Sequence, residues 1–458
     1  MSLSNSVLDT RFRSALGRMA EAGRLQTYSV PVDTYLEVAG LMKKLDGGPA
    51  LLFSKVDGYD IPVIGNLLSC QANVEAAFGA DFRGVRELVG RALGDPKPPV
   101  LVERAPVQEQ VHTKDIDIGK MLPALHHTAD DAGRYLTAGM LVARDPETGV
   151  ETEGYHRFQL KGPDRLGVSL HSRRRMFEYQ RRAEARGQAL PCAIVLGLHP
   201  LVSMGSLAYP PADVGKFEVV GGLLGEPLEV APCSTIDLHV PAAAEIVIEG
   251  EILAGVREPE GPFGEFTGYF SRRSTQHVFV AKALSMRERP WFQSIGSGRA
   301  GDHITTLGLV REAEIHNALG RVIPNVAGVH VPLSGTSSFS AYVAIKQGRP
   351  GEAKHVIPIV LGVDHYLKLV IVVDDDIDVF DESDVMWAVA TRMQADRDLV
   401  TVAGSLGALL DPSADERGVT AKLGIDATRP FGEPFADKLV MDPERMAWAR
   451  ALVDRLGR

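Results

Sequence analysis

The densest group of residues that could do chemistry is the segment EGPFGEFTGYF at residues 260–270. Two glutamates, Glu260 and Glu265, flank a Gly-Pro-Phe-Gly turn, and such a turn can hold both carboxyl groups near one point. Paired carboxyl groups in a partly dry site have pKa values that are pushed apart, so one of them can stay protonated as a general acid. The alternative is a surface turn with two solvated acids, which the long glycine-punctuated string disfavours.

The elements that must position this segment are predicted to be strands. Residues 135–144 (YLTAGMLVAR), 244–252 (AEIVIEGEI) and 276–284 (QHVFVAKAL) have the composition and alternation of strands, and glycine-rich turns separate them. The stretch from roughly 112 to 300 is therefore predicted to form a β-barrel or a sandwich.

Both flanks of this stretch are predicted to be mixed α/β regions. Residues 8–24 carry apolar side chains at helical spacing, and a second helix is expected to begin at Asp33, a residue type that caps helices. On the C-terminal side, a helix over 307–319 is followed by a buried strand over 366–379. A proline-rich strap at 95–107 marks the boundary between the first α/β region and the strands.

The composition excludes several classes of protein. Of 458 residues, 45% are hydrophobic and 24% are charged, which is typical of a globular chain with two or three domains. The formal net charge of -10 argues against a nucleic-acid partner. Cys70, Cys192 and Cys233 form no CxxC motif and suit no disulfide framework, so a reducing cytoplasm is expected. The sequence contains no apolar run of about 18 residues, so no membrane span is expected.

Over nearly its whole length the sequence resembles the UbiD-type decarboxylases, which use a prenylated flavin (prenylated FMN). The resemblance rests on a collinear series of segments whose order and approximate spacing agree with the family. These segments are 131–149 (DAGRYLTAGMLVARDPETG), 154–162 (GYHRFQLKG), 221–230 (GGLLGEPLEV), 241–252 (PAAAEIVIEGEI), the Glu260 loop, 374–378 (DDDID), 387–392 (WAVATR) and 423–430 (LGIDATRP).

The resemblance implies an α/β (α+β) fold with three domains. An N-terminal α/β domain is expected over residues 1–110, a central split β-barrel that binds the flavin over 111–302, and a C-terminal α/β domain that makes oligomer contacts over 303–458. It also implies a homodimer or a homohexamer, and a separate flavin prenyltransferase that supplies the cofactor.

The family's catalytic trio maps onto Arg157, Glu260 and Glu265. The guanidinium of Arg157 can hold a carboxylate through two hydrogen bonds, although an ordinary surface salt bridge is the alternative. The implied reaction is the reversible, non-oxidative decarboxylation of an aromatic or heteroaromatic acid, in which the flavin accepts the electrons that carbon dioxide leaves behind. In this reaction Glu265 donates the proton, and Arg157 with Glu260 orients it.

The positions expected at the flavin phosphate depart from the family's pattern. Family members usually hold this phosphate through a divalent metal, commonly manganese, with Asn, His and Glu ligands, and potassium is also usual in the family. Here these ligand positions align with Thr152, Arg175 and Lys216, and ammonium or guanidinium groups do not ligate a hard dication. We therefore expect the two cations to neutralise the phosphate directly, without a divalent metal. An alignment shifted by a residue would make Glu218 or His171 a ligand instead.

Four further residues are predicted around the cofactor and the substrate. Arg174 is expected at the cofactor, and Lys368 matches a family lysine that contacts the flavin phosphate, although a solvated lysine at a strand start is the alternative. His303 and Arg311 lie about two helical turns apart, and relatives that act on furan carboxylates use such a pair in the substrate pocket. The alternatives are a helix cap for His303 and a neighbouring glutamate as the partner of Arg311. Furan, pyrrole, indole or larger fused-ring acids are the preferred substrates.

Two other functions stay open. The chain could be a non-catalytic subunit of a carboxylase or decarboxylase complex, against which the retained Arg157, Glu260 and Glu265 argue. It could also be a split-barrel redox flavoprotein, although GSGRAG at 296–301 lacks the strand and helix context of a nicotinamide-binding motif.

Overall fold

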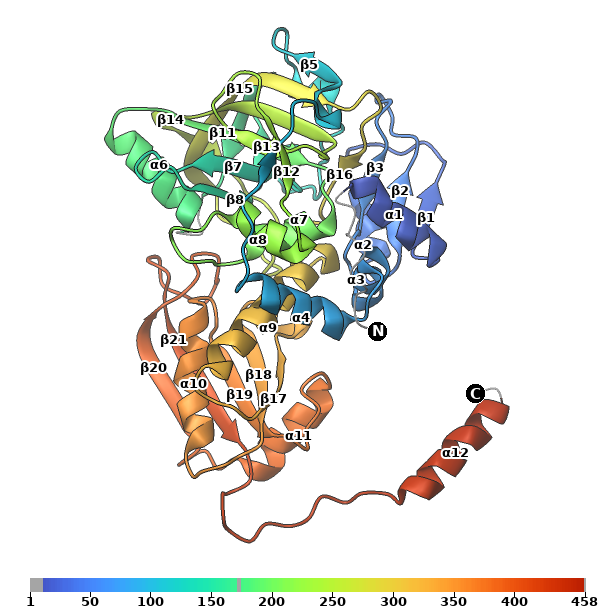
Figure 1. Cartoon of the computed structure of the whole chain (residues 1–458), viewed down its shortest axis with the longest axis vertical. Coiled ribbons are helices and arrows are strands. Elements are labelled where there is room, and N and C mark those ends of the chain that lie inside the picture. Colours follow the sequence, from blue (N-terminus) through green and yellow to red (C-terminus); the bar gives the residue numbers. More distant parts are fainter. Residues whose placement is uncertain (1–10, 171–173, 457–458) are drawn as a thin grey trace.

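The N-terminal part of the chain is an α/β layer, drawn in blue in Figure 1. The computed structural model describes residues 11–170 and 174–456. Phe12, Leu16 and Met19 lie on one face of the first helix and are buried, as their helical spacing predicts. The elements of this layer are α1 (Phe12–Glu21), β1 (Leu25–Tyr28), α2 (Glu37–Lys44), β2 (Ala50–Phe53), β3 (Val63–Gly65), α3 (Gln71–Phe78) and α4 (Phe82–Ala92).

The sheet of this layer is completed by a strand from much later in the chain. It has four strands in the order β1-β2-β3-β16, and β16 (Phe292–Gln293) pairs with β3 in parallel. The chain therefore returns to its first layer after the long strands of the central domain, and this return brings Gln293 to the wall of the main cavity.

The second helix begins later than the sequence predicts. Helix α2 starts at Glu37 and not directly after Asp33, because the Asp33 carboxylate accepts a hydrogen bond from the backbone N–H of Tyr35 at 2.6 Å. Leu36 then adopts a left-handed φ of 66°. An aspartate can close a local turn as readily as it caps a helix, and here the turn forms.

The centre of the molecule is a nine-stranded sheet that curls into a half-barrel. Its path is β6-β9-β10-β15-β14-β11-β7-β8, and β5 pairs with β15. The long antiparallel pair β14 and β15 has irregular register after Glu249 and after Ile252, where such strands bend. The strands are β5 (Gln110–His112), β6 (Tyr135–Leu136), β7 (Met140–Arg144), β8 (Glu151–Tyr155), β9 (Phe158–Leu160), β10 (Arg165–Val168), β11 (Leu190–Leu196), β14 (Ile246–Glu260) and β15 (Ser274–Met286).

Helices and a small sheet cover the half-barrel. Helix α6 contacts β7, β8, β11 and β14, while α7 and α8 pack against each other and against β8. A three-stranded sheet in the order β13-β12-β4 completes this part. These elements are β4 (Val100–Leu101), a 3-10 turn (Pro106–Gln108), α5 (Ile118–Met121), α6 (Arg175–Ala185), α7 (Pro200–Leu207), α8 (Lys216–Leu224), β12 (Glu229–Pro232) and β13 (His239–Pro241).

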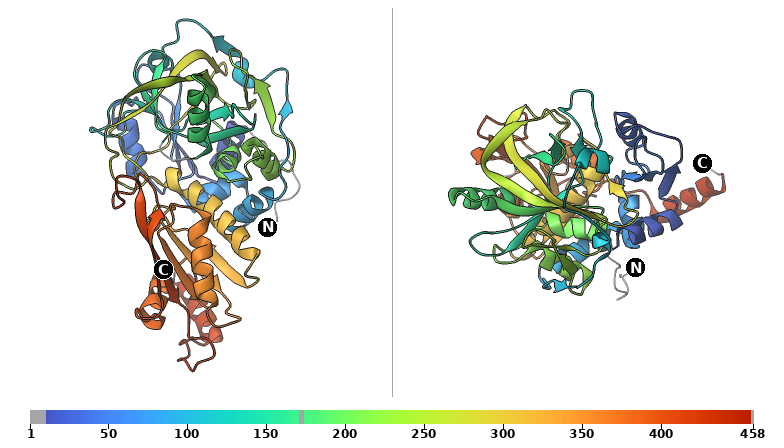
Figure 2. Two further views of the ribbon diagram at one scale, coloured as in Figure 1. Left: turned by 90° about the vertical axis from the view of Figure 1, so that its left-hand side faces the viewer. Right: turned by 90° about the horizontal axis from the view of Figure 1, so that it is seen from above.

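The helix α9 (Gly301–Gly320) joins the half-barrel to a C-terminal α/β layer (Figures 1 and 2). It contacts α4 and α7 on one side and α10 and β17 on the other. The C-terminal sheet has the order β17-β18-β19-β21-β20. Its elements are β17 (Val326–His330), a 3-10 turn (Leu333–Gly335), β18 (Ser340–Ile345), α10 (Glu352–Val363), β19 (Leu369–Asp374), α11 (Glu382–Arg392), β20 (Leu399–Leu406) and β21 (Val419–Ala427).

The last helix, α12 (Pro443–Arg455), extends away from the rest of the chain in Figure 1, and none of its residues is buried. None of the helices in the described part of the chain combines the length and the apolar character that crossing a bilayer needs.

The bend in the β14–β15 pair lies at Gly250, where a side chain has no room, and this can be tested. A Cβ added at Gly250 would lie 2.1 Å from the backbone carbonyl oxygen of Val280, which cannot move aside as the end of a side chain can. We expect Gly250→Ala to destabilise the protein by about 1–3 kcal/mol and to lower its melting temperature.

The matched control is Gly17→Ala on the exposed side of α1, where a Cβ meets nothing within 4 Å. This change is expected to stabilise the helix by about 0.5–1 kcal/mol. Calorimetry compares the two variants, and equal melting temperatures would contradict the packing argument.

Candidate functional site

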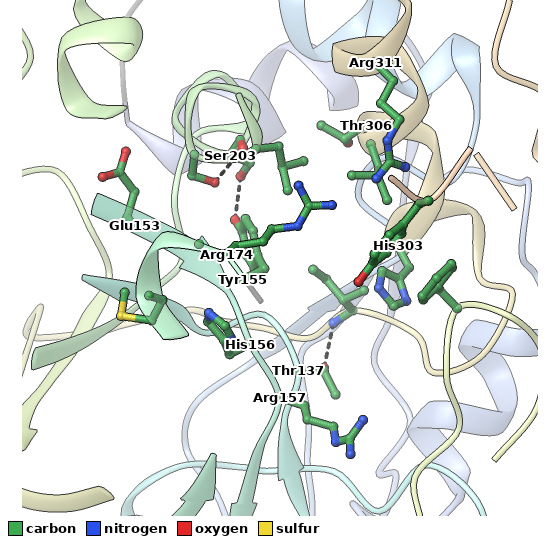
Figure 3. A pocket seen from close by; sticks show the side chains of 18 of the residues that line it. Thr137, Glu153, Tyr155, His156, Arg157, Arg174, Ser203, His303, Thr306 and Arg311 are labelled. Carbon is green, nitrogen blue, oxygen red and sulfur yellow. Dashed lines mark hydrogen bonds between the residues drawn. The ribbon is translucent and has the colours of Figure 1, made fainter. Parts of the chain in front are cut away.

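A cavity of about 720 Å³ lies where the half-barrel, the β16 segment and the C-terminal layer meet. Its size falls within the range of small-molecule and cofactor sites, about 300–1,000 Å³. Residues from all three parts of the chain line it, including Leu67 from the first layer, Arg157 from the half-barrel and Tyr366 from the last layer. Figure 3 shows side chains from the half-barrel and from α9 facing this space.

Arg157, Glu260 and Glu265 come together at the wall of this cavity. The Arg157 Nε donates to Glu260 Oε1 at 2.8 Å, and its Nη2 donates to Oε2 at 2.7 Å, while its Nη1 is paired with the Glu265 carboxylate. The three side chains are 9%, 0% and 9% exposed, so this is a buried cluster and not a surface turn. The structure thus brings together the three residues that the sequence singled out.

Aromatic rings and a short hydrogen-bonded loop hold the cluster in place. The Phe263 ring lies 5.4 Å from the Arg157 guanidinium carbon and 4.5 Å from the Tyr135 ring. The Ser271 hydroxyl accepts from the Phe263 N–H at 3.2 Å and from Arg157 at 3.3 Å. Burial, with the Glu260 charge adding to it, raises the pKa of Tyr135, so its phenol stays protonated. Sequence reasoning missed Tyr135 because a tyrosine in a strand pattern is indistinguishable from core.

Another part of the cavity carries three cations at the starts of two helices. Arg174 is the N-cap of α6 and Arg175 its first residue, while Lys216 is the first residue of α8. Helix N-termini present free N–H groups and a positive dipole, so they attract anions. Thr152 lines the same region and is 1% exposed. The arrangement suits a phosphate group.

Two of these cations are already engaged by backbone carbonyl groups. The Arg175 guanidinium donates to Val214 O at 2.8 Å and to Pro210 O at 2.5 Å. The Lys216 Nζ donates to Glu153 O at 2.8 Å and to Ser206 O at 2.5 Å. Their positive charges therefore stand at the cavity in fixed positions.

A buried carboxylate that sequence reasoning missed lies beside these cations. Glu153 is 1% exposed and lines the cavity, and neither of its carboxylate oxygens has a hydrogen-bond partner among the described residues. Burial raises the pKa of Glu153, and the Lys216 charge opposes that rise. Burial likewise lowers the pKa of Lys216, against the Glu153 charge. Nothing in the sequence marked Glu153, because a glutamate within the strand segment ETEGY resembles an ordinary solvated strand residue.

The donor set at this end does not fit a divalent metal. Within residues 11–170 and 174–456, no three His, Cys, Asp or Glu side chains are grouped so that they could hold a metal ion. The Glu218 carboxylate instead accepts from the Gly215 N–H at 2.8 Å, as part of the N-terminal cap of α8. His171 lies outside the described residues.

His303 and Arg311 both face the cavity from α9, as Figure 3 shows. Each nitrogen of the Arg311 guanidinium group has a partner. The group donates to Asp364 at 2.6 and 2.7 Å, to Ser337 O at 2.7 Å and to the Ser338 hydroxyl at 2.7 Å. Its partner is thus Asp364 and not a neighbouring glutamate. Burial lowers the pKa of His303 to about 4, so its imidazole is neutral at physiological pH.

Arg174 is a partly exposed cation in this region. Its side chain is 21% exposed, and it reaches toward the α9 side of the cavity in Figure 3. Its guanidinium carbon lies 4.3 Å from the Tyr209 ring and 5.0 Å from the Tyr366 ring, and Asp364 is 3.4 Å away. Although burial opposes it, the charges of Arg311 and Arg174 hold the pKa of Asp364 below its usual range. Arg174 is therefore a partly exposed cation held by one carboxylate and two aromatic rings.

Lys368 lies elsewhere. It precedes β19, and its Nζ contacts Asp411 Oδ2 at 2.6 Å and the Ser413 hydroxyl at 2.7 Å. Lys368 is not among the described residues that line the cavity, and its charge is already neutralised by Asp411. The expected contact of Lys368 with a flavin phosphate stays a prediction.

Comparison with known proteins identifies the class of protein. Models of the 3-octaprenyl-4-hydroxybenzoate carboxy-lyase match the chain with their N-terminal domain at 16–97, their Rift-related domain at 100–300 and their C-terminal domain at 304–427. The anhydromevalonate phosphate decarboxylase of Methanothermobacter thermautotrophicus is 33% identical over 401 residues, which are 87% of this chain and 93% of that one.

Solved structures agree. The UbiD-class enzyme HmfF from Pelotomaculum thermopropionicum, in complex with FMN, has a TM-score of 0.90 and 38% identity over 96% of this chain and 99% of its own. An evolved dimeric form of HmfF was solved with prenylated FMN, with a TM-score of 0.89 and 36% identity over 97% of this chain and 100% of its own. The apo 3,4-dihydroxybenzoic acid decarboxylase of Enterobacter cloacae has a TM-score of 0.86 and 30% identity over 96% of this chain and 99% of its own.

These matches define a carboxy-lyase with the three-domain fold of its relatives. The chain belongs to the UbiD family. The fold and the family that the sequence predicted are thereby confirmed.

The two arginines near Asp364 should behave differently when each is replaced by methionine. Arg311→Met leaves the buried Asp364 without its main partner, so we expect a loss of about 3–5 kcal/mol in stability. Arg174→Met removes a partly exposed contact and is expected to change stability by less than about 1 kcal/mol. Thermal and guanidinium unfolding of both variants measures the difference, and a larger loss for Arg174→Met would show that the roles are reversed.

Proposed function

We propose that this protein is a prenylated-FMN-dependent decarboxylase that releases carbon dioxide from an aromatic or heteroaromatic acid. The observation that carries the proposal is the buried cluster of Arg157, Glu260 and Glu265 at the wall of a 720 Å³ cavity. The same cavity has an anion-binding region with two helix starts, so it offers both contacts that a flavin nucleotide needs.

The residues present fit the cofactor at its phosphate. Arg174, Arg175 and Lys216 would hold the phosphate, with the α6 and α8 N-termini supplying N–H groups. Structures of HmfF contain FMN and prenylated FMN, which supports the same cofactor here. When bound, the prenylated flavin supplies an electron acceptor for the electron pair that carbon dioxide leaves behind.

Glu265 is the proposed proton donor to the carbon that has lost its carboxyl group. Arg157 lies against its carboxylate, so it stabilises the anion that remains after the proton has left. In the carboxylation direction the same carboxylate takes the proton back, which makes the reaction reversible. Glu260 holds the other side of the guanidinium through two hydrogen bonds and so fixes the direction of Arg157.

The aromatic surroundings keep water away from this proton transfer. Glu260 is fully buried, and the rings of Tyr135 and Phe263 are 0% and 4% exposed beside it. A dry site strengthens the electrostatic contacts of Arg157 and prevents protonation by solvent. Proton delivery then depends on Glu265.

The substrate side suits a flat acid with a second polar group. His303 is neutral and can donate or accept a hydrogen bond to such a group. A furan, pyrrole, indole or dihydroxybenzoate acid has a polar group of this kind. The anhydromevalonate phosphate decarboxylase raises a second candidate, an aliphatic unsaturated acid that carries a phosphate.

The same evidence disfavours the two other functions. A non-catalytic subunit has no need for the buried trio, and a redox flavoprotein has no need for a proton donor held by an arginine. Carbon dioxide release from a panel of aromatic, heteroaromatic and phosphorylated unsaturated acids, after co-expression with a flavin prenyltransferase, tests all of these readings together.

The catalytic role of Glu265 can be tested by Glu265→Gln. An amide cannot donate the proton, so we expect turnover to fall by about 10²–10⁴-fold while the absorption spectrum of the bound flavin stays unchanged. Glu258→Gln is the matched control, because Glu258 lies near the end of β14, shortly before Glu265, and its side chain pairs with Arg165 and is 30% exposed. Full turnover of Glu265→Gln would refute the assignment.

The loaded enzyme should work without manganese. Because the family's ligand positions hold Thr152, Arg175 and Lys216, a dication would meet two fixed positive charges there. We expect elemental analysis of the flavin-loaded protein to find no stoichiometric manganese, and dialysis against EDTA to leave both bound flavin and turnover unchanged. One manganese ion per chain in the flavin-loaded protein would contradict this prediction.

A further inference from the structure

The Lys216 ammonium sits between two backbone carbonyl groups from different elements. Glu153 belongs to β8, the edge strand of the half-barrel sheet, and Ser206 to the last turn of α7. Edge strands and helix ends leave carbonyl oxygens without partners, and Lys216 Nζ donates to both of them. Carbonyl oxygens arranged around a single positive charge are also what proteins use to bind potassium.

The Glu153 carboxyl group lies in the same part of the site. It is buried and its oxygens are unpartnered among the described residues, and burial raises its pKa while the Lys216 charge opposes that rise. Without the ammonium, the two carbonyl oxygens would face a buried space at the start of α8. Such a set of hard oxygen donors attracts a small cation.

We propose that Lys216 is a built-in monovalent cation: its ammonium occupies the place of a potassium ion and makes the anion-binding region independent of dissolved potassium. The inference rests on the proposed function, because the anion in question is the flavin phosphate. Lys216 is a positioning residue that acts through charge, beside the phosphate and away from the reacting carbon.

A second buried lysine separates this role from simple carbonyl satisfaction. Lys422 is 6% exposed, and its Nζ donates to Leu361 O and His365 O, each at 3.2 Å. It has the same kind of contacts as Lys216 but lies on β21 and is not among the described residues lining the cavity. Lys422→Ala is therefore the matched control for losing a lysine held by carbonyls.

The experiment measures FMN binding to the full-length protein prepared without flavin, by titration in KCl, NH4Cl or choline chloride at one ionic strength. Riboflavin, which lacks the phosphate, is the comparison ligand. Wild-type affinity for FMN should agree in all three salts, and riboflavin binding should not respond to salt or to substitution at Lys216. Elemental analysis for potassium accompanies each sample.

Lys216→Ala opens a space that a cation can fill. We expect its FMN affinity in choline chloride to fall about tenfold or more, as for the loss of one charged hydrogen-bond donor, and to recover in KCl or NH4Cl. Lys216→Gln keeps much of the side-chain volume without the charge, so its FMN binding should stay weak in every salt. Lys422→Ala should bind FMN as the wild type does in each salt.

Potassium-dependent FMN binding by the wild type would overturn the proposal. So would a Lys216→Ala variant that binds FMN normally in choline chloride, or whose FMN binding KCl does not restore.

If Lys216→Ala is too unstable to titrate, melting temperatures replace the titration. The rise in melting temperature from choline chloride to KCl must then be larger for Lys216→Ala than for the wild type and for Lys422→Ala. If the wild type binds FMN in no salt, the proposed function fails, and the same melting comparison still decides the cation site.

Discussion

The burial of the Arg157 guanidinium is the constraint on which the site depends. A cation that is only 9% exposed must be paired and hydrogen-bonded, because an uncompensated buried charge is strongly unfavourable. Glu260 meets this need at the end of the long strand β14, and the following turn brings Glu265 back to the same guanidinium. The half-barrel strands thus serve to deliver two carboxylates to one arginine, and the aromatic rings around them keep the cluster dry.

A second buried ion pair lines the opposite wall of the cavity. Arg311 on α9 and Asp364 after α10 join the central helix to the C-terminal layer, and both residues line the cavity. Arg174 of the half-barrel lies 3.4 Å from the same Asp364. The Asp364 carboxylate is therefore paired with arginines from two parts of the chain. Because these residues also line the cavity, the contact between the layers helps to set the shape of the cavity. An anionic ligand that draws Arg174 away leaves the stronger Arg311 contact in place.

Local patterns in the sequence were enough to predict many elements and the turn that carries Glu260 and Glu265, and the family resemblance added Arg157, but neither predicted the partners of isolated charges. Helical spacing predicted α1, and the glycine-proline turn predicted that Glu260 and Glu265 would meet. Arg311 and Lys368 find their partners, Asp364 and Asp411, through tertiary contacts between elements that no spacing rule connects. Glu153 escaped notice for the same reason, since its importance comes from burial next to Lys216.

Fixed cations and bound ions solve the same electrostatic problem at different costs. A bound ion must be taken from water and held by several oxygen ligands, and its presence depends on concentration. A buried lysine costs desolvation in every folded molecule, which orphan carbonyl groups and the nearby Glu153 offset. Its charge is then present before the ligand arrives, so a phosphate meets a preformed site at the α8 start. In the proposed function, Thr152, Arg175 and Lys216 at the family's ligand positions thus exchange one source of positive charge for another.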